Sequence, residues 1–406
     1  MSWEYIKLGE LYTVHNGLSK GRQFFGSGYP FLSFSTIFNN YFIPDELTDL
    51  VQSTEKEKES YSIQRGDVFV TRTSETSDEL GMSCVALKDY PHATYNGFTK
   101  RMRPIYPERV LPEYIGYYMR TPSFRGKFQA FSTMTTRASL RNEDLLGLMV
   151  ALPPLETQRR IASILSAYDD LIENNQKQIK LLEEAAQRLY KEWFVDLRFP
   201  NYENTPVVDG VPEGWKIEKI GNFVSTTSGG TPSRTHKEYY ESGTNLWVKT
   251  QELKDSYIID TDEKITDEAI KKSSAKIIPN GSLLLAMYGA TIGKLGIANC
   301  DLTCNQACCV FLFENDIWKR EYLYCWLIEN RVFLVSQGKG AAQPNLSQAL
   351  IKAIDILIPN ENLVKRFSKI ASVVFQKKCN LEIQIKSLNE ARDRLLPKLM
   401  SGELEV

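Results

Sequence analysis

The sequence lacks any hydrophobic run that approaches the roughly 18 apolar residues needed to cross a membrane. Its first residues carry charges and no apolar core of the kind found in secretory signals, so we expect a cytoplasmic protein with no membrane partner. Net charge is also small, because 49 Lys and Arg residues against 50 Asp and Glu residues give −1. This balance excludes a globally basic nucleic-acid-binding protein, so any such binding must come from local patches.

Histidine is scarce, and the cysteines do not follow metal-binding spacing. The three histidines lie far apart and suggest no Ser-His-Asp or Cys-His group: His15, His92 and His236. The seven cysteines are an odd number, and we expect free thiols. Four of them share one stretch without CxxC spacing: Cys300, Cys304, Cys308 and Cys309. We interpret that stretch as a buried strand and expect no metal site.

Catalytic motifs are missing as well. Phe24–Gly28 fits FxGxG, a loop motif of nucleotide methyltransferases, but an adenine methyltransferase also needs Asn or Asp before Pro-Pro and an aromatic residue. The only Pro-Pro, Pro153-Pro154, lies between leucines. Gly289–Leu295 is one residue short of a phosphate loop and lacks its Ser or Thr. We therefore expect no catalytic residue and no cofactor in this chain.

What the sequence does contain is an internal repeat. The matching segments are Trp3–Gly9 with Trp215–Gly221, Gly66–Val70 with Gly281–Leu285, Gly81 with Gly293, Glu113-Tyr114 with Glu321-Tyr322, and Ala138–Leu140 with Pro344–Leu346. Two units are too few for a solenoid, so the repeat indicates a tandem duplication. Short apolar runs such as Val68–Val70 predict strands, whereas Leu111–Met119 and Tyr322–Val335 predict helices. We expect two similar modules of mixed α and β structure, an α+β chain.

A long amphipathic helix follows each module. In the first helix the seam positions alternate in steps of four and three, as in a coiled coil, and Asn175 is their only polar member: Ile161, Leu165, Tyr168, Ile172, Asn175, Ile179, Leu182, Ala186, Leu189 and Trp193. The second helix, expected over about 363–396, carries a less regular seam: Phe367, Ile370, Val374, Leu381, Ile385, Leu388 and Leu395. Asn175 is interpreted as a register device. The repeat favours pairing of the two seams over packing on separate cores.

Four segments follow from this order: a first module over residues 1–152, a helix and connector over 153–200, a second module over 201–358 and a second helix over 359–406. A pseudo-two-fold axis between the halves would make the helices antiparallel, as a coiled-coil spacer. Thirty helical residues span about 45 Å, which covers roughly 13 base pairs of B-DNA. Such a chain could present its two modules to two separated sites on a duplex.

Candidate DNA contacts are polar residues in loops that match between the modules. A basic stretch with interleaved aromatic residues, Phe98 to Arg141, is one local patch. In the first module the candidates are Lys20, Arg22, Ser35, Thr36, Arg72, Thr73, Ser74, Thr135, Thr136 and Arg137. In the second module they are Arg234, Thr250, Gln251, Tyr288, Gln343 and Asn345. Each could equally be a solvated loop residue.

Several motifs resemble those of specificity subunits of type I restriction–modification systems. They are SGGTPSR (228–234) with Tyr239-Tyr240, Gly243 and Trp247-Val248, then LPPLETQRRIASIL (152–165), LYKEWFVDLRFP (189–200), VPEGW (211–215) and LLPKLMSGEL (395–404). Together they cover essentially the whole chain. The first module departs most, with GLSKGR (17–22) where the second has GGTPSR.

The resemblance implies two target recognition domains that bind a split target in double-stranded DNA. It implies helices that recruit two methyltransferase subunits, with restriction and translocase subunits joining for cleavage. S-adenosylmethionine, ATP and Mg²⁺ are then expected on those partner subunits. Two alternatives stay open: a coiled-coil scaffold that joins two protein-binding modules, and a self-contained DNA methyltransferase, which would need a catalytic motif that the sequence does not show.

Overall fold

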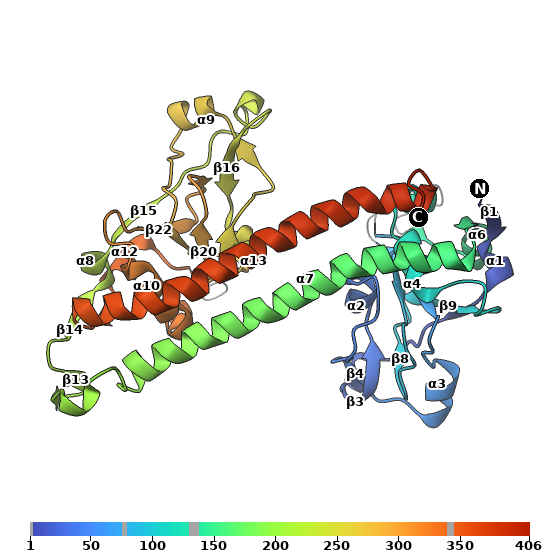
Figure 1. Ribbon diagram of the computed structural model, residues 1–406, viewed down its shortest axis with the longest axis horizontal. Coiled ribbons are helices and arrows are strands. Elements are labelled where there is room, and N and C mark those ends of the chain that lie inside the picture. The colour runs from blue at the N-terminus through green and yellow to red at the C-terminus, as the bar shows by residue number, and fades with distance from the viewer. Residues whose placement is uncertain (1–2, 75–78, 130–137, 339–344) are drawn as a thin grey trace. The chain divides into compact units, whose positions relative to one another are not determined.

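The computed structural model describes residues 3–74, 79–129, 138–338 and 345–406. The chain divides into two compact units, one made of Met1–Leu171 with Leu388–Val406 and the other of Ile172–Ser387. Each unit combines one module with the adjoining parts of both long helices (Figure 1). The four segment boundaries expected from the sequence stay a prediction.

The first module is built on a four-stranded antiparallel sheet with the order β2 (Tyr12–Asn16), β9 (Thr99–Pro104), β5 (Val68–Thr71) and β7 (Ser83–Val85). A smaller sheet has the order β4 (Leu50–Val51), β3 (Phe25–Leu32) and β8 (Thr94–Tyr95), in which β3 and β8 are parallel. The first and last strands of the module form a ribbon, β1 (Glu4–Lys7) with β11 (Met149–Leu152).

The second module repeats this topology. Its large sheet has the order β15 (Ser225–Ser228), β22 (Cys308–Leu312), β19 (Leu283–Ala286), β20 (Leu295–Ala298) and β17 (Ser256–Ile258). Its small sheet has the order β18 (Lys264–Ile265), β16 (Asn245–Val248) and β21 (Thr303–Cys304), again with the last pair parallel. The ribbon joins β14 (Lys216–Lys219) to β23 (Asp355–Ile358). Four strands of the large sheet keep the same order in both modules, and β17 adds a fifth strand to the second sheet. The shared order confirms the predicted duplication and the mixed fold class.

The central strand of each module is buried on both faces, which explains its unbroken apolar sequence. In β5, Val68 and Val70 belong to one hydrophobic core while Phe69 belongs to another. In β19, Leu283 and Leu285 likewise face one core, and Leu284 and Ala286 face a second. Alternation along a strand therefore divides each module into two layers of packing.

Helices cover one face of each large sheet. The first module has α4 (Pro112–Tyr118), α5 (Pro122–Gln129) and α6 (Asn142–Leu146), and the second has α10 (Lys319–Glu329), α11 (Arg331–Ser336) and α12 (Gln348–Ala353). The single helix expected over Tyr322–Val335 is wrong, because Asn330 leaves helical geometry with φ −95° and ψ 13°. Its side-chain amide donates to the carbonyl of Trp326 at 2.9 Å, which ends α10 locally.

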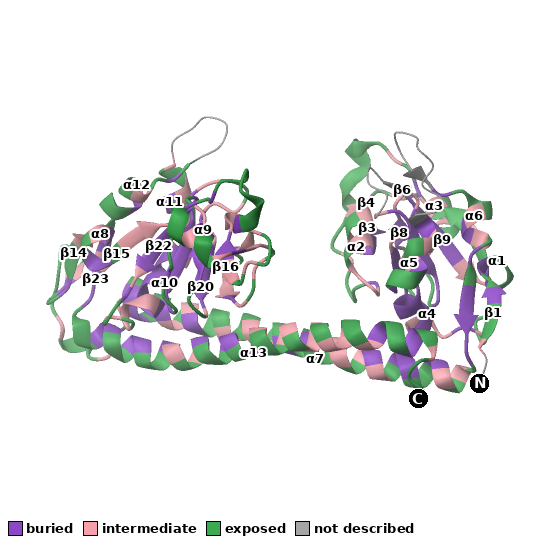
Figure 2. Cartoon of the chain, turned by 90° about the horizontal axis from the view of Figure 1, so that it is seen from above, coloured by how far each residue is buried: buried purple, intermediate pink, exposed green. Residues whose placement is uncertain are grey.

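The two long helices are α7 (Leu155–Tyr190) and α13 (Glu361–Ser401). In the first unit, Ile161 and Leu165 near the start of α7 share a core with Leu396 and Leu399 near the end of α13. In the second unit the opposite ends of the helices meet, because Tyr190 at the end of α7 packs against Phe367 near the start of α13. Each unit therefore shows an antiparallel pair, along which buried and exposed positions alternate (Figure 2). Within the described residues, no helix combines the length and apolar character needed to cross a membrane.

The predicted helix seam divides by burial. Its buried members are Ile161, Leu165, Ile172, Asn175, Ala186, Trp193, Phe367 and Leu381. Its half-buried members are Tyr168, Ile179, Leu182, Leu189, Val374, Ile385, Leu388 and Leu395. The placement of Ile370 in the seam is wrong, because it is 45% exposed and the core side of α13 runs through Phe367, Ala371 and Phe375 instead. The amide of Asn175 faces Gln384 at 3.4 Å, a polar cross-helix contact of the kind that fixes register.

One close backbone approach holds the start of each module together. The loop after β2 crosses the turn after β8, where the amide of Leu18 donates to the carbonyl of Tyr95 at 2.9 Å. A Cβ atom on Gly17 would lie 1.9 Å from the Asn96 carbonyl oxygen. In the second module a Cβ atom on Gly229 would lie 1.8 Å from the Cys304 carbonyl oxygen. Only glycine permits this crossing.

Replacing Phe367 by alanine should destabilise the second unit by about 3–5 kcal/mol, because a buried phenyl ring is lost from the core. The matched control is Ile370→Ala on the same helix, which should cost about 0.5 kcal/mol or less at its half-exposed position. Chemical denaturation of both variants measures the difference. Equal losses would show that the seam does not run through Phe367.

Gly17→Ala should destabilise the first unit by about 1–3 kcal/mol, because the new methyl group overlaps the Asn96 carbonyl. Gly126→Ala in α5 is the control, since its Cβ would meet nothing within 4 Å. That helix-interior change should stabilise by up to about 1 kcal/mol. Thermal unfolding of the two variants compares them, and a Gly17 variant as stable as the wild-type chain would contradict the crossing.

Candidate nucleic-acid interface

An asparagine turn occupies the same place in both modules. It follows Thr94-Tyr95 in the first module as Asn96 and Thr303-Cys304 in the second as Asn305. The Asn96 side-chain oxygen accepts from the amide of Phe98 at 2.7 Å, and that of Asn305 accepts from the amide of Ala307 at 3.1 Å. Each turn is thus closed by its own asparagine side chain.

The loops that carry the predicted contacts meet around this turn. The Asn96 amide donates to Leu32, the last residue of β3, and the Asn305 amide donates to Val248, the last residue of β16. The residues after these strands therefore lie next to the turn. These are Ser35 and Thr36 in one module and Thr250 and Gln251 in the other. The loops that contain Gly17 and Gly229, called the glycine loops below, cross the same turn. The segments that follow these glycines, up to Arg22 and Arg234, therefore belong to the same group of loops.

The loop after the central strand joins the same cluster. The amide of Arg72 donates to Phe98 at 3.0 Å, and the amide of Met287 donates to Ala307 at 2.9 Å. Leu140 in turn donates to the Arg72 carbonyl at 2.9 Å, as Leu346 does to Met287 at 2.8 Å. Four loops that are distant in sequence therefore end at one place in each module.

In the first glycine loop, the side chain of Lys20 is engaged by contacts within the module. Its ammonium pairs with Glu57 at 2.7 Å and donates to the Gln52 carbonyl at 2.5 Å, and its side chain is 13% exposed. Arg22 is exposed and forms no ion pair within the described part of the chain. Of the two predicted cations, Arg22 has the guanidinium available for a phosphate or a guanine edge.

In the second glycine loop, the side chain of Arg234 is 56% exposed, but its guanidinium is already paired. Its guanidinium pairs with both oxygens of Glu263 at 2.6 and 3.1 Å and lies 4.2 Å from the ring centre of Tyr240 and 5.2 Å from that of Trp247. The Arg234 hydrogen bond, with help from Lys249, lowers the pKa of Glu263 to about 2. Arg234 therefore organises the loop, because its planar fork is already occupied by a carboxylate.

The loops after β3 and β16 offer different exposed groups. Thr36 lies in α2 (Phe34–Asn39), where its amide donates to Ser33, whereas Ser35 is exposed. The Thr250 carbonyl accepts from Thr291 at 2.8 Å, whereas Gln251 is exposed. Ser35 and Gln251 are thus the candidates whose side chains face solvent at this position.

The end of β5 carries a local excess of positive charge. The buried Nε of Arg72 has no hydrogen-bond partner among the described residues. Burial lowers the pKa of the neighbouring Lys100, and the charge of Arg72 lowers it further; Lys100 donates to Asn142. Phe98 beside them is 59% exposed. Such a site complements an anion, which the cations attract, and a base, which can stack on the Phe98 ring.

The remaining predicted residues are placed in part. Thr73 is half-buried in β6 (Thr73–Ser74), which pairs with β10 (Ala138–Ser139); the side chain of Ser74 is not described. Tyr288 is half-buried after β19, and Asn345 is exposed before α12. The other four predicted contacts lie outside the described residues: Thr135, Thr136, Arg137 and Gln343.

The basic stretch of the first module is not a continuous surface. Arg101 donates to the Ser62 carbonyl at 2.7 Å, and Arg103 pairs with Asp67 at 2.6 Å. Arg120 donates to the carbonyls of Ile37, Asn40 and Ser83. Backbone carbonyls and the Asp67 carboxylate engage these cations, and a sequence cannot distinguish such cations from surface charge.

Sequence reasoning also missed the centre of the site. Asn96 and Asn305 were not singled out, although Thr-x-Asn recurs at matching positions of the repeat, and Phe98 served only to mark the start of the basic stretch. The buried-strand interpretation of the cysteines is confirmed for Cys304, Cys308 and Cys309, which lie in β21 and β22, whereas Cys300 is exposed.

Comparison with known proteins agrees with this architecture. The family model described as "Type I restriction modification DNA specificity domain" matches residues 1–184 and 212–388. The type I restriction enzyme MjaIX specificity subunit of Methanocaldococcus jannaschii is 27% identical, over 100% of this chain and 94% of the relative. The HindI specificity subunit of Haemophilus influenzae is 23% identical, over 99% of both chains.

A solved structure shares the fold. It is an S subunit of a type I restriction–modification system from M. genitalium, 15% identical, with a TM-score of 0.60 over 98% of this chain and 96% of that chain. The duplicated modules and the two matches of the family model lead to one assignment: the chain belongs to the family of type I restriction–modification DNA specificity subunits and carries the specificity domain twice.

Proposed function

We propose that each module reads one half of a bipartite target in double-stranded DNA through the loops around Asn96 and Asn305. The observation that carries this proposal is that the same four loops converge on the same turn in both modules. A protein with two equivalent reading sites suits a target with two separated parts. The family assignment supports DNA as the ligand.

The proposed role of each loop residue follows from the exposure and the chemistry of its side chain. Arg22 and Arg72 supply cations for phosphates or guanine edges. Ser35, Gln251 and Asn345 offer hydroxyl and amide groups of the kind that discriminate base edges. Phe98 offers a face for stacking. Because these residues differ between the modules, the two halves of the target should differ in sequence.

The chain is proposed to act as a non-catalytic subunit in the cytoplasm. Two methyltransferase subunits would dock on it and modify adenine, and restriction and translocase subunits would join for cleavage. S-adenosylmethionine, ATP and Mg²⁺ would bind those partners. The missing adenine-methyltransferase motif supports this division, as do relatives that are named specificity subunits.

Exchange of residues 1–150 for the first module of another family member should change one half of the methylated target and leave the other half and the gap unchanged. The reason is that each module contains its own complete set of reading loops. Methylome sequencing of cells that express the chimera with its partner subunits measures both halves. The control exchange of residues 201–358 should change the opposite half, and a chimera that alters both halves would refute independent reading.

The purified chain alone should transfer no methyl group from S-adenosylmethionine and cut no DNA, because it lacks a catalytic motif. Addition of the methyltransferase subunits should produce methylation at the bipartite target. Transfer of tritiated methyl groups to a plasmid substrate measures both reactions. Methylation by a preparation shown by mass spectrometry to be free of partner subunits would contradict the non-catalytic assignment.

A further inference from the structure

Where the first module meets the two long helices, a polar cluster connects α4 with both of them. The buried Tyr117 of α4 donates its hydroxyl to Asp169 of α7 at 2.5 Å. The other oxygen of Asp169 accepts from Arg392 of α13 at 2.6 Å. The ring of Tyr41 lies 5.5 Å from the Arg392 guanidinium. Module, first helix and second helix are thus joined in one chain of directional contacts.

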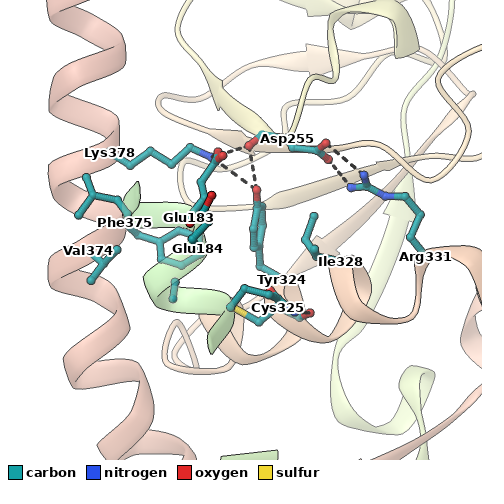
Figure 3. A pocket seen from close by; sticks show the side chains of 13 residues that line it. Glu183, Glu184, Asp255, Tyr324, Cys325, Ile328, Arg331, Val374, Phe375 and Lys378 are labelled. Atoms are coloured by element: carbon teal, nitrogen blue, oxygen red, sulfur yellow. Dashed lines mark hydrogen bonds and ion pairs between the residues drawn. The ribbon is translucent and has the colours of Figure 1, made fainter. Parts of the chain in front are cut away.

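Where the second module meets the long helices there is a cluster of the same kinds of residue. Lys378 of α13 pairs with Glu183 of α7 at 2.6 Å, and its side chain is only 4% exposed. The same ammonium donates to the Asp255 carbonyl at 2.5 Å and to the hydroxyl of Tyr324, on α10, at 3.5 Å. Figure 3 shows Lys378 pointing at all three partners. Again an acid on α7, a base on α13 and a tyrosine of the module meet.

The clusters are not inherited copies of each other. The repeat aligns Tyr114 with Tyr322, and both donate to the ribbon, to Ala151 and Leu357. That alignment sets Gly116, not Tyr117, opposite Tyr324. A Cβ on Gly116 would lie 2.4 Å from the ring of Phe42, which fills that space in the first module. Two different residue sets therefore bring an acid, a base and a tyrosine together, with different connections. Tyr117 donates to the acid Asp169, whereas Tyr324 donates to the Asp255 carbonyl at 2.8 Å and accepts from Lys378.

Apolar packing alone does not define the second joint. An open cavity of about 280 Å³ lies beside Lys378, between α7, α10 and α13, with Leu182, Phe375 and Ile328 in its wall (Figure 3). Hydrophobic contact is non-directional and tolerates small rotations where space is free. Charge-assisted hydrogen bonds are directional, so the Lys378 cluster selects one orientation.

The main partner of Lys378 is Glu183, although Glu382 is closer to it in the sequence. Glu382 lies 3.8 Å from the ammonium and accepts from the amide of Tyr257 at 2.8 Å. Burial raises the pKa of Glu382 to about 7, so this carboxyl carries only part of a charge near neutral pH. The cross-helix pair therefore supplies the counter-charge.

We infer that the two clusters, Tyr117–Asp169–Arg392 and Tyr324–Lys378–Glu183, are positioning locks that fix how each module stands on the helix pair and so restrict the gap between half-sites that the chain accepts. This inference rests on the proposed reading of a bipartite target. None of the six residues belongs to the reading loops. Loss of a lock should leave base recognition intact and widen the range of accepted gaps.

The test uses the complete methyltransferase complex and duplexes that carry the two half-sites with the native gap or with one base pair more or fewer. In Arg392→Met and Lys378→Met the ratio of methylation rates at altered and native gaps should rise about tenfold, which corresponds to about 1.4 kcal/mol. Tyr117→Phe removes one hydroxyl only and should raise the ratio about threefold. Lys177→Met is the matched control, since it breaks the Glu173–Lys177 pair, which is well exposed on α7.

A residue that merely stabilised the fold would lower methylation at every gap alike and leave this ratio unchanged. An unchanged ratio in assembled Arg392→Met and Lys378→Met complexes overturns the inference. If either methionine variant fails to assemble, Tyr117→Phe decides, and an unchanged ratio there overturns it equally. Failure of the wild-type complex to methylate any bipartite target would instead refute the proposed function.

Discussion

The candidate reading site of each module depends on the close approach of two backbone segments. Gly17 passes so near the Asn96 carbonyl, and Gly229 so near that of Cys304, that neither position admits a side chain. This contact fixes the loop after the first strand of the sheet to the asparagine turn. The loops after β3 and β16 are fixed to the same turn by one hydrogen bond each. A change at the crossing would displace several candidate contacts together, whereas a change at an exposed loop residue would affect only one.

The two modules share a backbone framework and differ in the side chains that this framework carries. Arg72 and Phe98 of the first module stand where the second has Met287 and Ala307, although the backbone hydrogen bond between each pair is the same. A main-chain framework that does not depend on these side chains can accept substitutions at the reading surface without loss of fold. Such a framework suits a protein whose two halves address different sequences.

The sequence allowed the repeat, the central strands and the two long helices to be predicted, because each leaves a periodic or repeated pattern. It misplaced one position of α13, because Ile370 is more apolar than Ala371, yet packing against the module buries Ala371 and leaves Ile370 exposed. It also overestimated the basic stretch, because Arg101 and Arg120 look like surface charges until the carbonyls that they satisfy are known. The asparagine turn went unnoticed because its importance is geometric: it lies where four loops meet.

The joints between module and helix pair obey a different rule from the reading loops. The loops share a backbone and differ in side chains, whereas the two joints share a chemical design and differ in the positions that build it. Phe42 fills the space beside Gly116 in the first module, and Tyr324 fills the matching space in the second. Both joints bring an acid of α7, a base of α13 and a tyrosine of the module together, although the hydrogen bonds connect them differently. This indicates that the orientation of the module, and not the identity of any one residue, is what the fold must maintain. Directional contacts meet that requirement beside a cavity, where apolar packing leaves free space.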